Sequence, residues 1–135
     1  MLRPAFALVL WTFVMWTWMY ATRLPAMRKL RMVPDPTAVR GEQMAQLPPE
    51  VRWKADNYNH LFEQPTLFYA VTVALSVLGV TTSLDVGLAW AYVGLRIVHS
   101  LVQSLINKIE LRFAVFALSS LVLLGLAVRG ALLLV

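Results

Sequence analysis

The chain has 135 residues, enough for one domain, and 59% of them are hydrophobic while only 14% are charged. Soluble domains carry about 25% charged residues, so this composition excludes a soluble globular, disordered or coiled-coil protein. The sequence contains no cysteine, which excludes disulfides, thiolate metal sites and a cysteine nucleophile. The composition therefore indicates a protein that is surrounded by lipid.

The first apolar segment, residues 5–22, contains no charge and lies between Arg3 and Arg23. A helix needs about 20 apolar residues to cross the roughly 30 Å of hydrocarbon in a bilayer. A cleaved signal peptide is the alternative interpretation, but the aromatic run ending at Tyr20 leads directly into Arg23 without a small-residue cleavage site. We therefore predict a retained transmembrane helix over residues 5–22.

A long polar segment follows, and its end marks the start of a second helix. Pro49 suits the first turn of a helix, and Glu50 lies where the helix dipole favours an anion. The uncharged part of this helix begins only at Gln64. We predict one helix over residues 50–80 whose polar first turns project out of the membrane.

Two further apolar segments complete the chain. Residues 84–107 are interrupted by Arg96, and residues 111–135 form the last segment. The connections between the last three segments are short, and short connections require antiparallel neighbours. We expect a single all-α domain, an integral membrane protein built as an antiparallel four-helix transmembrane bundle.

The basic residues predict the orientation of this bundle. Arginines and lysines gather in the first loop, over residues 23–57, and in the third loop, at Lys108 and Arg112, whereas the second loop has none. The positive-inside rule places these two loops in the cytoplasm and both termini outside. The formal net charge of +5 is then a topology signal, and we expect no nucleic-acid partner.

Polar residues form a stripe on each of two predicted spans. A charge at the membrane centre costs about 2.5–3.5 kcal/mol, so such residues need partners. Spacings of three and four residues place them on one helix face. The stripe on the third span consists of Arg96, His99, Ser100, Gln103 and Asn107, and that on the second of Asp56, Asn59, His60 and Glu63. We predict that Glu63 faces Arg96, either as a structural ion pair, as part of a cytoplasmic pocket for a charged ligand, or as both.

The remaining assignments concern His99, a metal site and Arg129. His99 is either a packing residue or a base or ligand. His60 and His99 with Glu63 form too small a ligand set, so we predict no metal site. Arg129 is expected to reach the outer interface with its charged end, without a chemical role.

The sequence resembles the MAPEG family, the membrane-associated proteins in eicosanoid and glutathione metabolism, in three motifs. The segment from Asn59 through Glu63 to Pro65 is similar to the start of helix 2 in that family. Arg96 and His99 resemble its Arg-x-x-His segment on helix 3, and Arg112 falls where the family has an arginine that activates a thiol. Together the motifs cover helices 2 to 4 in the family's order.

This resemblance implies a bacterial inner-membrane homotrimer that binds glutathione between subunits on the cytoplasmic side. Asn59 and Glu63 would bind the polar ends of glutathione, while Arg96 and His99 would support the pocket. Arg112 would stabilise the thiolate, which would attack a lipophilic small molecule delivered by the membrane lipid. The implied activity is that of a glutathione-dependent transferase or peroxidase acting on lipophilic electrophiles.

The sequence also departs from the family pattern. Asp56 stands where the family commonly has an arginine, and Phe116 stands where eicosanoid-specific members have a tyrosine. Two other function classes therefore remain open. One is a non-catalytic member that binds a lipid or a partner, and the other is a small channel or transporter subunit.

Overall fold

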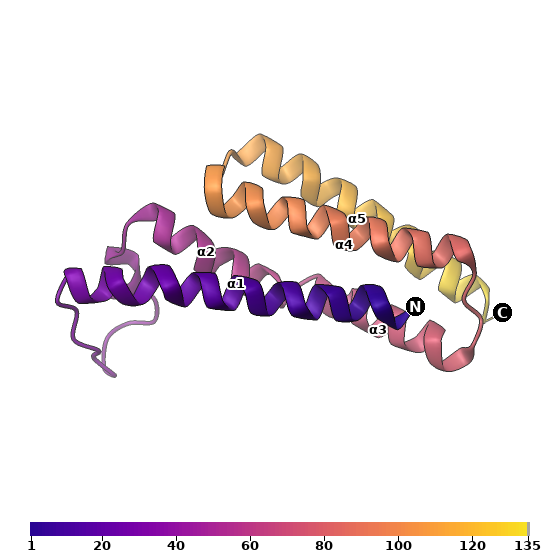
Figure 1. Ribbon diagram of the computed structural model, residues 1–135, viewed down its shortest axis with the longest axis horizontal. Coiled ribbons are helices and arrows are strands. Elements are labelled where there is room, and N and C mark those ends of the chain that lie inside the picture. Colours follow the sequence, from indigo (N-terminus) through magenta and orange to yellow (C-terminus); the bar gives the residue numbers. More distant parts are fainter. Residues whose placement is uncertain (135) are drawn as a thin grey trace.

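The computed structural model describes residues 1–134, and within them it contains helices and connecting segments without a strand. The helices form a long, narrow bundle (Figure 1). In chain order they are α1 (Leu2–Lys29), η1 (Met44–Gln46), α2 (Pro49–His60), α3 (Pro65–Leu78), α4 (Ser83–Leu101), η2 (Val102–Ile106) and α5 (Ile109–Leu132).

The segment expected to form one helix over residues 50–80 is interrupted. It begins at Pro49, as the sequence predicts, but α2 ends at His60 and α3 begins only at Pro65. Pro65 has no backbone N–H to donate to the carbonyl four residues earlier, and it disfavours helical backbone at the residue before it. The break at residues 61–64 therefore lies immediately before the proline.

The third expected segment ends in an unusual way. α4 begins with a capping box, in which Thr82 and Asp85 satisfy each other's backbone N–H groups. At its other end the backbone widens into the π-helix η2, which closes with Asn107 in the left-handed conformation at φ 49°. Such π-helical turns are rare and are frequent at functional sites.

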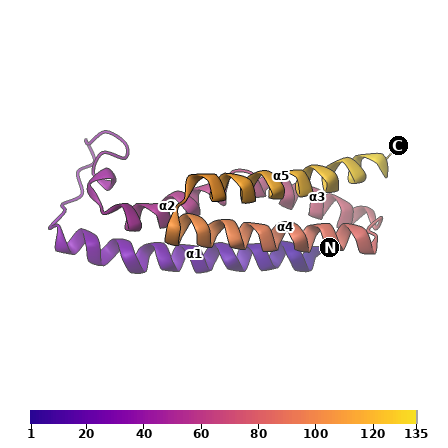
Figure 2. The same ribbon diagram turned by 90° about the horizontal axis from the view of Figure 1, so that it is seen from above.

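The helices run up and down along the bundle. Both termini and the α3–α4 turn lie at one end, while the segment after α1 and the turn after η2 lie toward the other (Figures 1 and 2). At the first end Gly79 ends α3 with a positive φ of 68°, which glycine adopts without strain. The predicted placement of the two basic loops on the same side is consistent with this arrangement.

The buried core of the bundle is apolar and joins all four long segments. Leu8 and Met15 of α1 pack with Phe68 of α3, and the Phe68 ring stacks on Tyr92 of α4 at 4.6 Å between centroids. Leu126 of α5 belongs to the same cluster. Most other large apolar side chains are exposed, as expected for helices that face lipid.

Within residues 1–134, three segments are long and apolar enough to cross a membrane: Leu2–Lys29, Pro49–Leu78 and Ile109–Leu132. The fourth expected span, which corresponds to α4, is not among them. It carries Asp85, Arg96 and His99, all of which are buried inside the bundle. The chain is thus an all-helical integral membrane protein in which the polar residues of α4 face other helices.

Arg129 has a structural role that the sequence interpretation missed. Its Nε donates to Oδ1 of Asp85 at 2.8 Å, and the Asp85 side chain is fully buried while that of Arg129 is 36% exposed. No partner was predicted for Asp85, and Arg129 was expected only as an interfacial charge. The two residues instead form an ion pair that joins the start of α4 to the end of α5.

Candidate functional site

Arg96 is buried in the bundle, but its partner is not the predicted one. Its Nη2 atom lies 2.9 Å from Nδ1 of His60 and donates to the His60 backbone carbonyl at 3.2 Å. That carbonyl can accept from Arg96 because α2 ends at His60 and its helical hydrogen bonds do not continue beyond it. Helix C-termini carry partial negative charge that favours a cation. Arg96 therefore caps the broken end of α2.

Glu63 lies outside this contact, so the predicted Glu63–Arg96 ion pair is wrong. Its side chain is 67% exposed, and its carboxylate approaches only Nε2 of His60, at 3.6 Å. The helix break explains the error, because Glu63 falls within the unwound residues 61–64, where the helical spacing from Asn59 no longer applies. The pocket therefore does not depend on a Glu63–Arg96 pair.

We expect Glu63→Gln to change the free energy of unfolding by less than about 0.5 kcal/mol, because the carboxylate is exposed and an exposed contact such as that with His60 contributes little. Unfolding in detergent, followed by circular dichroism, measures this change. A loss of several kcal/mol would mean that Glu63 is buried against a cation after all.

His60 and His99 form the centre of one pocket. Their rings stack with centroids 5.0 Å apart, and the Phe116 ring packs against both, at 5.4 and 6.0 Å. The pocket has a volume of about 200 Å³ and is lined by His60, His99, Ile109, Arg112, Phe113 and Phe116. It combines a cation and two imidazoles with apolar walls.

Arg112 is held in this pocket by its own loop. Its Nη1 donates to the side-chain oxygen of Asn107 at 2.7 Å, and Asn107 is the residue that closes the π-helix η2. The guanidinium is therefore positioned by α5 and by the turn before it. Arg112 thus lines one pocket with both histidines.

Asn59 lies in a different pocket. Because it neighbours His60 on α2, the helical rotation turns it to another face. Its pocket has a volume of about 400 Å³ and is rich in arginine; it is lined by Arg23, Arg40, Gly41, Met44, Ala45, Arg52, Ala55, Asp56 and Asn59. The structure thus brings Arg96, His99 and Arg112 together but places Asn59 elsewhere.

Several residues of these two pockets were not identified from the sequence. His60 was expected in the polar stripe of the second span and considered as a weak metal ligand, but its contacts with Arg96 and His99 were not predicted. Arg23 and Arg40 were interpreted only as topology signals. For the Asn59 pocket the sequence offered one signal. The i, i+3, i+7 spacing of Arg52, Ala55 and Asn59 places these three residues on one face of α2.

A buried lysine connects α2 to η2. Lys54 donates to the backbone carbonyls of Glu50, at 2.8 Å, and Ser104, at 3.2 Å. Asn57 and Ser100 are also fully buried. The Lys54 bond to Ser104 ties α2 to the π-helix that precedes Asn107.

The structure gives no geometry for a metal centre within residues 1–134. No three side chains of the ligating types His, Asp and Glu gather there closely enough to hold an ion. The residues offer one cationic, partly apolar pocket and a second, arginine-rich pocket.

These features define a membrane-embedded helical protein with cationic pockets toward the end of the bundle that carries its basic loops. The chain belongs to the MAPEG family, because the sequence model of that family matches residues 1–132. Comparison with curated proteins and with solved structures gives no match. Membership supports, at the level of the family, a membrane-bound function related to glutathione or eicosanoid metabolism.

Proposed function

We propose that the protein is a glutathione-dependent transferase or peroxidase that acts on lipophilic electrophiles. The observation that carries this proposal is the position of Arg112, whose guanidinium lines a pocket with His60 and His99 and is fixed by Asn107. A charge that served only topology would have no reason to be held in this way. Membership in the MAPEG family supports the same reaction class.

The physical role of Arg112 is to favour the charged form of a thiol. A nearby cation lowers the pKa of a thiol, and the thiolate is the reactive nucleophile. The glutathione thiol releases its proton to solvent water, and the sulfur then forms a bond to the electrophilic carbon while the leaving group departs with its electron pair. Electrophiles dissolved in the bilayer reach the site through its apolar side, at Phe113 and Phe116.

The second pocket suits the rest of glutathione. This tripeptide carries two carboxylates and an α-amino group, and Arg23, Arg40 and Arg52 offer cations for the carboxylates. Glu63 is exposed at the end of α2 and is suited to the amino group, and Asn59 adds an amide.

A homotrimer explains how two separate pockets serve one ligand. Within a single chain the Asn59 and Arg112 pockets share no lining residue. We infer that the Asn59 pocket of one subunit meets the Arg112 pocket of the next, so that glutathione lies between them. Arg96 and His99 support the pocket from within the bundle.

The membrane arrangement belongs to the same proposal. The chain crosses a bacterial inner membrane four times, with α4 as the polar crossing shielded by its neighbours and the termini outside. The two basic loops face the cytoplasm, which is where glutathione is available. The common position of both termini at one end of the bundle supports an even number of crossings (Figure 1).

Addition of glutathione to the purified protein is expected to produce the ultraviolet absorbance of a thiolate. Arg112→Ala should remove most of this absorbance, because the stabilising cation is lost. Lys108→Ala is the matched control, since Lys108 is an exposed basic residue of the same turn and should leave the signal unchanged.

Two results would contradict the proposal. One is the absence of a thiolate signal from the wild-type protein at saturating glutathione. The other is an equal loss of signal in Arg112→Ala and Lys108→Ala, which would make the effect one of general charge. Glutathione binding without thiolate formation would instead favour the non-catalytic alternative, in which the trimer binds a lipid or a partner.

A further inference from the structure

An apolar cavity lies beside the break between α2 and α3. It has a volume of about 180 Å³ and is lined by Val9, Thr12, Phe13, Tyr58, Leu61, Phe62 and Tyr69. None of these residues lines the Arg112 pocket or the Asn59 pocket. The cavity is therefore a separate feature of the chain.

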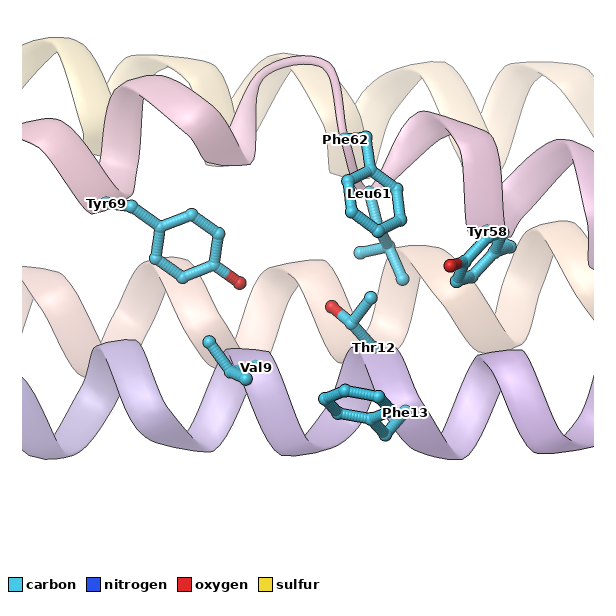
Figure 3. A pocket seen from close by; sticks show the side chains of 7 residues that line it. All are labelled: Val9, Thr12, Phe13, Tyr58, Leu61, Phe62 and Tyr69. Atoms are coloured by element: carbon cyan, nitrogen blue, oxygen red, sulfur yellow. The ribbon is translucent and has the colours of Figure 1, made fainter.

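The helix break creates this space. Leu61 and Phe62 belong to the unwound residues 61–64 and line the cavity at the point where α2 and α3 separate. Across from the break, α1 presents Val9, Thr12 and Phe13 (Figure 3). The walls are α1 on one side and the flanks of the break on the other.

The cavity opens toward the lipid-facing surface. Phe13 lies near the middle of α1, and both Phe13 and Phe62 are exposed at its edge. Both belong to segments that are apolar enough to cross a membrane. An apolar molecule can thus enter from the hydrocarbon without crossing water.

Hydroxyl groups give this apolar cavity its specificity. The hydroxyls of Tyr69 and Thr12 point toward one another across the space, and that of Tyr58 points inward from the far side (Figure 3). Thr12 already donates to the Leu8 carbonyl at 2.9 Å, so its hydroxyl is an acceptor toward the cavity. The Tyr69 hydroxyl faces this acceptor, so a ligand oxygen would replace Thr12 as the group that accepts from Tyr69.

The size and the walls define the ligand class. An apolar cavity of about 150 Å³ holds a molecule of the size of benzene, so this one accommodates a single ring with a short substituent. Four of the seven lining residues are aromatic, and aromatic rings pack favourably on one another. We propose that the cavity binds a small lipophilic molecule with a flat, aromatic body and one oxygen that accepts a hydrogen bond from Tyr69. This binding needs no glutathione, so it stands or falls independently of the transferase proposal.

Photolabelling with 3-phenyl-3-(trifluoromethyl)diazirine, a single ring with a short substituent, tests the site in the full-length protein in lipid nanodiscs, without glutathione. On irradiation the diazirine loses nitrogen to give a carbene, which bonds to nearby C–H groups that mass spectrometry locates. We expect labels concentrated on the cavity residues, with acetophenone competing. Acetophenone should compete better than α-methylstyrene, which has the same shape but carries a methylene in place of the oxygen.

Two variants decide the outcome. Tyr69→Phe removes only the hydroxyl and should cut the advantage of acetophenone over α-methylstyrene about fivefold, the effect of one hydrogen bond. Val9→Trp should fill the cavity and remove the labels, whereas Val73→Trp, on the exposed face of α3, should not. Labels spread evenly over lipid-facing residues, as a nonspecific acyl-chain site would give, would overturn the proposal. An unchanged preference in Tyr69→Phe would overturn it as well, and that variant keeps the test valid if Val9→Trp does not fold.

Discussion

Replacing Arg129 with methionine is expected to lower the free energy of unfolding by about 3–5 kcal/mol, because it leaves a buried carboxylate without its cation. Asp85 is fully buried and accepts from Arg129 Nε at 2.8 Å. The same carboxylate is held by the backbone N–H and the hydroxyl of Thr82, at 2.9 and 2.6 Å, so it cannot turn away to water. Thermal and denaturant unfolding in detergent measure the loss.

Arg3→Met is the matched control, since Arg3 is an exposed arginine toward the same end of the bundle and should cost little. The double variant with Asp85→Asn should recover part of the loss, because no uncompensated charge is then buried. If Arg129→Met costs no more than Arg3→Met, the Asp85–Arg129 pair does not hold α4 to α5.

The second large effect concerns mixed oligomers. Trimers made only of Arg112→Ala subunits, or only of Asn59→Ala subunits, should form little thiolate. Co-expression of the two variants should restore about one quarter of the sites, because each half of an intersubunit site then has an even chance of being intact. Thiolate absorbance on the co-purified mixture, with separate affinity tags on the two variants, measures the recovery.

Separately purified variants mixed without subunit exchange supply the baseline for this experiment. No recovery in verified mixed trimers would mean that Asn59 and Arg112 act within one subunit. It would also mean that the two pockets do not join across a subunit boundary.

The helices could largely be predicted from the sequence, because long uncharged segments and proline positions are local properties of the chain. The start of α2 at Pro49 is one example. The break at residues 61–64 also had a local signal in Pro65, whose effect on the preceding turn is a general rule. That signal competed with a continuous apolar pattern, which favours one unbroken helix.

The partners of the buried charges could not be predicted in the same way. Helical spacing defines which residues share a face, but it does not define which neighbour that face meets. Arg96 was correctly expected to be buried, yet it bonds to the His60 ring and to the His60 carbonyl, which can accept from it because α2 ends there. Asp85 and Arg129 lie 44 residues apart, and only the packing of α4 on α5 brings them together.

A structure determined in a bilayer with glutathione bound tests the central claim most directly. The account predicts a trimer in which the glutathione sulfur lies beside the Arg112 guanidinium of one subunit and the carboxylates contact the arginines around Asn59 of the next. Glutathione bound with its sulfur away from Arg112, or no bound glutathione at a saturating concentration, would contradict it.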